Sequence, residues 1–421
     1  MKYRLYRKIV YIIILFCMPR THFAWDNAHF YRSPYFWGEP RYERSKLSTW
    51  QAYFGWSFAK NGRNSDGKKT NILNIYGPYN MHNVGSNVST LDPQNPLDRI
   101  VIDLNNVTNV SPTFGVFSFE GKFHSFEILL EAYQNIVSGF FLHLMLPIRK
   151  LKINSIRSKD LTPRREENIP VWQEFKRNFS AILERQNISI APFNKMGLGD
   201  FTFTAGWARN YENTETLDFI DIDARVGVLF PTGAPKNENR VFSLPLGYNK
   251  HWGVPLTFNA SLGIWDWLTA GFHISALFLV DKNIDIRIKT DTVQSGLIRF
   301  ALENAKVDPG SLLNLQLYAK ADHVTNGISA YLVYHFNYRE PTSIALRNGS
   351  TIDSGAVRSD LSYHSWRMHS MQFGLEYDHA AQLSDIGPRL GIFYNHVFKG
   401  KRIFDADLKY SYIGFDAAWC Y

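Results

Sequence analysis

The sequence predicts an all-β fold, an antiparallel transmembrane β-barrel of about twelve strands, with fourteen as the alternative. Three observations predict it. Many segments alternate apolar with polar residues, the C-terminal half contains no long apolar run, and long and short connections follow one another along the chain. A period of two gives a strand one apolar and one polar face. Segments of about ten residues suit a membrane-crossing strand, whereas strands of soluble proteins average about 5–6 residues.

The alternation places the expected strands in order along the chain. In 367–378, for example, Met371, Phe373 and Leu375 alternate with Gln372 and Glu376. Tryptophans near several expected strand ends are typical of membrane-interface girdles. The expected strands cover residues 50–59, 115–133, 137–148, 199–208, 218–230, 253–264, 268–280, 313–322, 327–338, 367–378, 386–398 and 403–421.

The connections between these strands support the same fold. Bacterial membrane barrels have short turns on the periplasmic side and long loops outside. The expected short turns are 134–136, 209–217, 265–267, 323–326 and 379–385. The expected long connections are 60–114, 149–198, 231–252, 281–312 and 339–366. Only the last connection, 399–402, is too short for the series.

Composition narrows the class of protein further. The chain has 421 residues, with 45% hydrophobic and 15% aromatic residues, and its mean hydropathy is −0.24. These values are too polar for a helical membrane protein but suit strands that are half polar. The net charge of +8 is not gathered in basic blocks, so no nucleic-acid partner is expected. We find no enzyme motif, so no catalytic residue, cofactor or metal is expected.

Residues 1–24 match a secretory signal peptide. Basic residues precede the apolar stretch 9–18, which is too short to span a bilayer, and cleavage is expected near Ala24 although His22 departs from the small-residue rule. Only Cys420 would remain after cleavage, so no intrachain disulfide can form. Residues 25–48 are expected to form an N-terminal plug or a periplasmic segment, and residues 49–421 the barrel.

Two shorter features are expected within the connections. A helix begins at Pro170 and carries an apolar stripe that includes Trp172 and Phe175. It either folds into the barrel mouth or packs on the loop surface. A second short helix is expected over 297–305, and a short strand over 72–76.

Charged and polar residues on the inward parity are the candidate site. Mixed charges facing a lumen suit either a hydrated selective pore or a closed interior filled by ion pairs. Twelve strands enclose a narrower space than the 16- to 18-strand porins, so free passage of large solutes is not expected. The candidate pore-lining residues are Asp221, Asp223, Arg225, His273, Gln316, Lys320, Asp322, His335, Glu376, Asp378, Arg389, Asp405, Asp407 and Lys409.

The C-terminal segment carries a resemblance to a known signal. Apolar residues recur at every second position in the list Ile413, Phe415, Ala417, Trp419 and Tyr421. This resembles the C-terminal assembly signal of Gram-negative outer-membrane proteins, although Phe is the usual last residue there. The resemblance implies the barrel-assembly machinery as a partner. An apparent change of parity within the strand predicts a β-bulge near Gly414.

A second resemblance bears on function. The segment 228–233, Val-Leu-Phe-Pro-Thr-Gly, resembles a strand end of outer-membrane proteins linked to uptake of hydrophobic compounds. The mature chain as a whole is similar to Gram-negative outer-membrane β-barrels, including the fatty-acid transporter type with an N-terminal plug. This implies a location in the outer membrane, in contact with its lipid, and passive, porin-like or channel-type passage of small solutes, hydrophobic ones included. The alternatives are a closed structural or adhesive barrel that acts through its extracellular loops, and an exported soluble β-protein.

Overall fold

The computed structural model describes residues 47–137, 139–212, 217–265, 267–325, 327–347, 350–378 and 387–418. The expected signal peptide and the terminal residue Tyr421 lie outside this part of the chain. So does the expected plug or periplasmic segment, except for its last residues, Leu47 and Ser48, which already belong to the first barrel strand.

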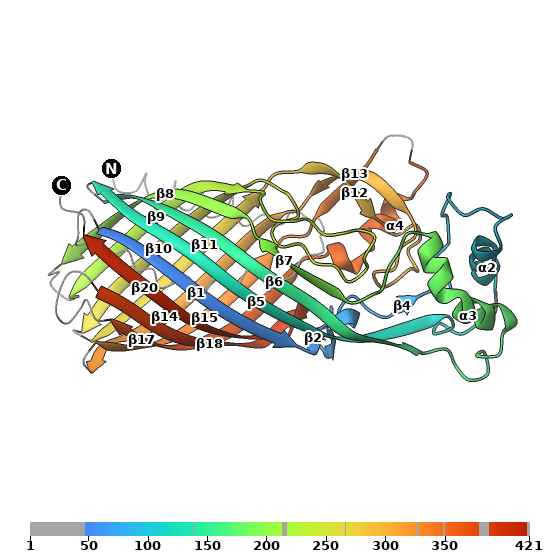
Figure 1. The fold of residues 1–421 in the computed structure, drawn as a ribbon, viewed down its shortest axis with the longest axis horizontal. Coiled ribbons are helices and arrows are strands. Elements are labelled where there is room, and N and C mark those ends of the chain that lie inside the picture. Colours follow the sequence, from blue (N-terminus) through green and yellow to red (C-terminus); the bar gives the residue numbers. More distant parts are fainter. Residues whose placement is uncertain are drawn as a thin grey trace, which may run out of the picture.

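Twelve antiparallel strands form the barrel wall (Figure 1). β1 pairs with β5 on one side and with β20 on the other, and this second pairing closes the sheet. Each of the twelve expected strands corresponds to one wall strand. The wall strands are β1 (Leu47–Ala59), β5 (Val116–Val137), β6 (Phe140–Asp160), β8 (Phe201–Glu212), β9 (Phe219–Phe230), β10 (Gly253–Trp265), β11 (Leu268–Leu279), β14 (Ser311–Thr325), β15 (Ile328–Arg339), β17 (Trp366–Asp378), β18 (Gly387–Lys401) and β20 (Asp407–Ala418).

The two ends of the barrel differ in the length of their connections. We call the end with the short hairpins β5–β6, β8–β9, β10–β11, β14–β15 and β17–β18 the turn end, and the opposite one the loop end. The long connections all leave from the loop end, as expected from the sequence. In bacterial membrane barrels the turn end faces the periplasm.

The long connections fold into one structure, which we call the cap. It consists of the described residues of 60–115, 161–200, 231–252, 280–310 and 340–365, and Figure 1 shows it at the opposite end of the molecule from the turn end. It contains η2 (Ile72–Asn74), α2 (Pro96–Asn105), α3 (Pro170–Arg185), α4 (Ser354–Arg358) and η3 (Leu361–Tyr363). Its strands are β2 (Asn61–Arg63), β3 (Lys69–Asn71), β4 (Tyr79–Asn80), β7 (Phe193–Leu198), β12 (Lys282–Arg287), β13 (Leu302–Asp308) and β16 (Ser343–Leu346), and β19 (Ile403–Phe404) pairs with β2.

The cap has its own hydrophobic core, continuous with the loop end of the wall. Trp172 and Phe175 on the apolar stripe of α3 are fully buried, and Trp172 packs on Phe117 of β5 with ring centroids 5.2 Å apart. The same core includes the inward residues Trp366 and Met368 of β17. The helix at Pro170 is therefore confirmed, and it packs on the cap core rather than inside the barrel mouth.

Three local expectations differ from the structure. β5 and β6 are 22 and 21 residues long, because their loop-end halves continue as a ribbon into the cap, where β4 pairs with β5 and β7 with β6. The expected helix over 297–305 is wrong, because Leu302–Asp308 forms β13 between β12 and β16. The expected strand over 72–76 is wrong as well, since Asn71 caps a 3₁₀ turn there through its side chain.

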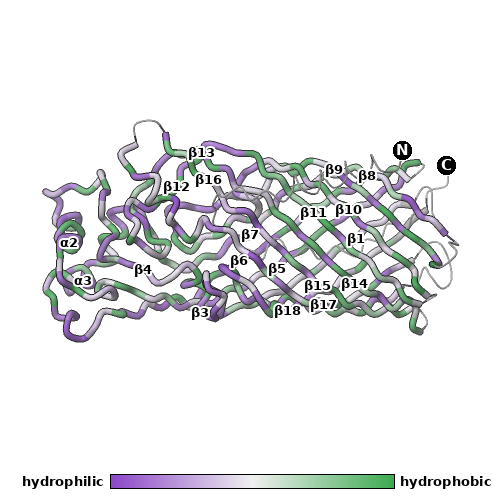
Figure 2. The backbone as a smooth tube through the Cα atoms, turned by 180° about the vertical axis from the view of Figure 1, so that it is seen from behind, coloured by the Kyte–Doolittle hydropathy of each residue, from purple (hydrophilic) through white to green (hydrophobic). Residues whose placement is uncertain are grey.

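The outer face of the wall is an apolar belt. Figure 2 shows hydrophobic and hydrophilic residues alternating along the wall strands. Near the turn end, Trp50 is 58% exposed, and Trp265 stacks on Trp267 with ring centroids 5.6 Å apart. Near the loop end, Trp56 and Phe58 are about half exposed. Two aromatic bands around an aliphatic middle are the arrangement of a membrane-spanning barrel.

On the inner face, aromatic rings lie over glycines of neighbouring strands. A Cβ atom at Gly391 of β18 would overlap the Tyr412 ring of β20, and one at Gly374 of β17 would overlap the Phe393 ring. Because glycine has no side chain, these positions leave room for rings that lie flat along the wall. Such cross-strand contacts also specify register.

We expect Gly391→Ala to destabilise the barrel by about 1–3 kcal/mol, the cost of overpacking a fitted site. The added methyl group displaces the Tyr412 ring. Urea unfolding in detergent, followed by tryptophan fluorescence, measures the effect. Gly414→Ala on β20 is the matched control, because the nearest atom to its Cβ would be Gln51 Cγ at 3.2 Å, with no ring in the way. Equal unfolding midpoints for both variants would contradict the fitted packing of the ring.

Candidate functional site

The barrel interior brings together most of the predicted site residues. Their side chains take the inward parity of their strands, alternating with outward apolar neighbours. The inward residues among the fourteen candidates are Asp221, Asp223, Arg225, His273, Gln316, Lys320, Asp322, His335, Glu376, Asp378 and Arg389. Whether solutes pass between them stays a prediction.

The other three candidates do not face the lumen. Asp405 lies before β20 in the last connection, where it forms an ion pair with Arg63 of β2 at 3.4 Å. Asp407 and Lys409 lie on the outer face of β20. Their outward parity follows from the inward position of Tyr410, which is 5% exposed. The rule that polar residues point inward fails here because this side of the lumen is aromatic.

The expected β-bulge near Gly414 is wrong for the same reason. β20 pairs with β1 without a register shift from Asp407 to Ala418. Ile413 and Phe415, on the same parity as Lys409, are about half exposed on the outer face. One parity therefore faces outward along the whole strand. The sequence seems to change parity only because the inward residues of this strand include aromatic ones, Tyr410 and Tyr412.

One part of the lumen wall is lined by ion pairs. Asp223 is fully buried on β9 and accepts hydrogen bonds from Arg225 Nε at 2.8 Å and Nη2 at 3.3 Å. On β14, Lys320 Nζ lies 2.6 Å from Asp322 Oδ1, and Thr269 of β11 donates to the same carboxylate. A charge buried in a narrow barrel is costly unless it is paired in this way.

Sequence reasoning missed the inward charges of β5 and β6. Glu131 lies 3.7 Å from His143 Nε2, and Glu127 pairs with Arg149. Glu127 and Glu131 lie two residues on either side of the buried Leu129, on the same parity. This alternation could have identified both as inward residues.

Another part of the wall is aromatic, and Lys320 Nζ lies 5.3 Å from the ring centroid of Tyr331 in it. Its buried cluster includes Tyr53, Leu129, Tyr318, Tyr331, Val333, Phe393, Leu408, Tyr410 and Tyr412. Glu376 of β17 lies within this strip and accepts hydrogen bonds from the hydroxyl groups of Tyr331, at 2.9 Å, and Tyr412. Tyr412 also stacks on Phe393, with ring centroids 5.7 Å apart and planes 19° apart. The strip thus presents ring faces together with a hydrogen-bonded carboxylate.

A cavity of about 160 Å³ lies where the lumen meets the cap. Arg149 of the wall donates from Nη1 to the carbonyl of Leu246 in the cap at 2.9 Å. Asp200, just before β8, accepts from the backbone N–H groups of Gly233 and Tyr248, and burial raises its pKa. The cavity lining combines charged, hydroxyl and apolar groups, including His143, Arg149, Asp200, Thr202, Arg225, Tyr248, Pro255, His273, Leu277, Leu312 and Asn337.

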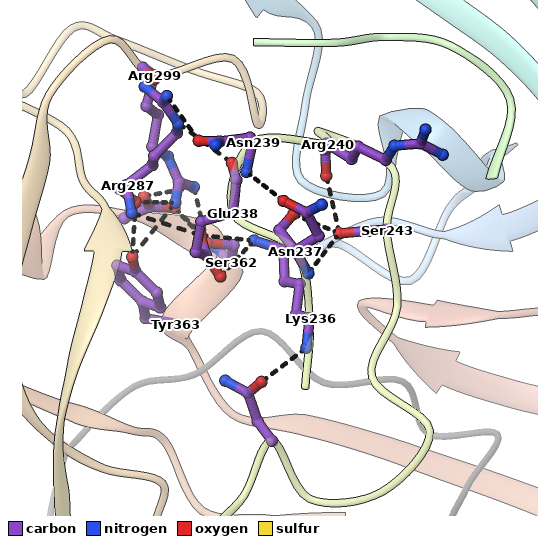
Figure 3. Close-up of polar contacts among 12 residues, drawn as sticks. Lys236, Asn237, Glu238, Asn239, Arg240, Ser243, Arg287, Arg299, Ser362 and Tyr363 are labelled. Carbon is purple, nitrogen blue, oxygen red and sulfur yellow. Dashed lines mark hydrogen bonds and ion pairs between the residues drawn. The ribbon is translucent and has the colours of Figure 1, made fainter. Parts of the chain in front are cut away.

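Arg287, the last residue of β12, holds three cap connections together (Figure 3). It donates from Nη2 to the carbonyl of Gln186 at 2.8 Å, from Nε to that of Glu238 at 3.1 Å, and from Nη1 to that of Phe300 at 3.0 Å. Burial lowers the pKa of its guanidinium, and the Glu238 carboxylate opposes that shift. A planar fork of five donors suits such a set of carbonyl acceptors.

Arg299 adds the connection 340–365 to this network. It forms an ion pair with Asp360, donates from Nη2 to Ser362 Oγ at 2.8 Å, and lies over the Tyr363 ring. Burial lowers and Asp360 raises the pKa of Arg299, and the net direction is upward. The two arginines therefore join four of the five connections into a single unit.

No helix among the described residues is long and apolar enough to cross a membrane. Within the same part of the chain, no group of three or more His, Cys, Asp or Glu side chains is arranged to hold a metal ion.

We expect Arg287→Met to loosen the cap while the barrel stays folded. Each buried carbonyl that loses its donor costs about 1–3 kcal/mol. Limited proteolysis should then cut faster within 231–252 and 280–310, while the heat-modifiable barrel band on gels persists. Arg240→Met is the control, because that exposed guanidinium makes no contact drawn in Figure 3. Equal cleavage rates in the two variants would show that Arg287 does not hold the connections together.

No protein-family model and no curated protein matches the chain. Among solved structures, it is similar to an outer membrane channel from Pseudomonas putida F1, with a TM-score of 0.49 and 11% identity, over 89% of this chain and 96% of that chain. A FadL homologue from Pseudomonas aeruginosa matches with a TM-score of 0.32 and 6% identity, over 89% and 91% of the two chains. The translocator domain of the autotransporter NalP from Neisseria meningitidis matches with a TM-score of 0.31 and 9% identity, over 89% of each chain. These structural neighbours are Gram-negative outer-membrane β-barrels, and at this level the likeness concerns barrel architecture and not the solute.

Proposed function

We propose that the protein is an outer-membrane channel for passive passage of small solutes, hydrophobic ones included. The observation that carries the proposal is the two-sided lumen. Ion pairs such as Asp223–Arg225 line one part of the wall, and the aromatic strip around Glu376 lines the other. A solute with an apolar body and a polar group would find a matching surface on each side.

The geometry of the cap supports a selective channel rather than a wide one. The cavity of about 160 Å³ below the cap is small, and Arg149 and Leu246 link the wall to the cap beside it. Solutes that enter from the loop end would pass between cap and wall. The cavity would then select solutes by their size and polarity before they reach the aromatic strip.

The location and assembly of the barrel belong to the same proposal. The apolar belt with two aromatic bands supports a bilayer location, and short hairpins at the turn end support the outer-membrane orientation. We infer from the alternation up to Tyr421 that the barrel-assembly machinery recognises the C-terminal strand.

A second candidate function is favoured by the cap itself. Its hydrophobic core, the sheet β12–β13–β16 and the Arg287 network make it a folded structure of its own. A closed barrel that displays this cap as a structural or adhesive surface would use the same features without any passage of solutes.

Planar-bilayer recording of the refolded protein distinguishes these functions. We expect discrete conductance steps. Lys320→Gln leaves the Asp322 carboxylate without its cation, so the permeability ratio should shift towards cations, and Asp322→Asn should shift it towards anions, each by about twofold or more. Lys409→Gln is the control, because Lys409 lies on the outer face and its loss should leave selectivity unchanged.

Insertion without conductance, verified by a gel shift, would favour the closed surface barrel instead. Conductance that responds to Lys409→Gln as strongly as to Lys320→Gln would contradict the assignment of inner and outer faces.

A further inference from the structure

A groove of about 1380 Å³ crosses the outer face of the barrel wall. It runs over β6, β5, β1, β20, β18, β17 and β15, which are consecutive neighbours in the sheet. This volume exceeds the roughly 300–1,000 Å³ of ordinary small-molecule pockets. Outward side chains that line it include Trp56, Phe58, Phe126, Lys150, Lys152, Phe373, Leu375, Ile392, Tyr394, Asp407 and Lys409.

The groove follows rows of cross-strand neighbours. Lys150 pairs with Phe126, Phe126 with Trp56, Trp56 with Lys409, and Lys409 with Tyr394. Because barrel strands are tilted by about 35–45°, a row perpendicular to the strands crosses the membrane obliquely. One end of the groove, its high end, therefore lies near the loop end of the barrel, and the other, its low end, lies closer to the turn end.

The high end lies at the level of lipid headgroups. Lys150 is ten residues beyond the turn-end start of β6 at Phe140, which corresponds to a height of about 25 Å. Leu375 is three residues from the turn-end limit of β17 at Asp378, at a height of about 8 Å. The apolar band of such barrels is about 25 Å tall, so the groove runs from the loop-end interface deep into the hydrocarbon region.

The charges of the groove are positive and concentrated at its high end. Lys150, Lys152 and Lys409 are exposed, and within the described residues none of them forms an ion pair with a carboxylate. Asp407, the acidic residue in the lining, accepts hydrogen bonds from the Tyr394 hydroxyl at 2.7 Å and from His396 Nδ1 at 2.9 Å. The three lysines are therefore available to bind an anion from outside the protein.

We propose that this groove binds an anionic lipid of the outer leaflet, with headgroup phosphates on Lys150, Lys152 and Lys409 and acyl chains along the apolar lower part. Lysines near a membrane surface attract phosphate-bearing headgroups, and the aromatic and aliphatic lining suits hydrocarbon chains. The site does not depend on the lumen being open, but it rests on the proposed outer-membrane location, with the loop end facing outward.

Native mass spectrometry of the full-length protein in detergent, with lipid A added as the probe, tests this site. We expect one tightly retained lipid A on the wild-type protein. The triple variant Lys150→Gln, Lys152→Gln, Lys409→Gln should bind it at least about tenfold more weakly, because three attractive charges are lost. All three side chains are exposed, so their replacement should leave folding intact, as the heat-modifiable gel band would report.

The control removes the same charge elsewhere. Lys68→Gln, Lys69→Gln and Lys159→Gln change three exposed lysines at the loop end that do not line the groove, and retention of lipid A should match the wild type. Equal retention by the two triple variants would overturn the proposal. Stronger retention of phosphatidylglycerol than of lipid A would overturn the assignment to an outer-leaflet lipid.

Discussion

The pairing of β1 with β20 is the constraint on which the rest of the structure depends. Leu47 to Phe58 face Ala418 to Asp407 in an unbroken register, so the barrel wall has no free edge and each wall strand is paired on both sides. Closure also separates two environments. With only twelve strands the interior is narrow, and inward side chains contact one another, so the charges there occur as pairs such as Lys320–Asp322. The outward side chains meet lipid, which requires the apolar belt between its aromatic bands.

The cap depends on the barrel in turn. β5 and β6 leave the wall as one ribbon, and the connections fold around it, with Trp172 of α3 against Phe117 of β5. Arg287 and Arg299 then join connections that start from different wall strands. A network of buried arginine contacts of this kind requires that all its acceptors are brought to one place first. The barrel does this by fixing where each connection begins and ends.

The wall could be predicted from sequence because apolar and polar residues alternate regularly along its strands. Alternation and the order of long and short connections located all twelve strands, and the eleven inward candidates follow from parity. Asp407 and Lys409 were assigned to the wrong face because Tyr410 and Tyr412 reverse the usual polarity of the lumen, and no periodic rule reveals which side of a barrel interior is aromatic. The strand β13 was taken for a helix because its partners, β12 and β16, lie in other connections. Arg287 could not be identified for the same reason, since its acceptors are backbone carbonyls of three separate connections.

The aromatic strip explains why polar residues of β20 face outward. Inward Tyr410 lies over Gly55 of β1, and inward Tyr412 lies over Gly391 of β18, so the rings need this parity. Asp407 and Lys409 then have to lie on the outer face. Their cost is limited by height, because both are near the loop-end interface, where charges on the lipid face cost about 0–1 kcal/mol rather than the 2–4 of the midplane. The inward tyrosines thereby determine which residues of β20 face outward. Asp407 and Lys409, which line the proposed lipid-binding groove, face outward for this reason.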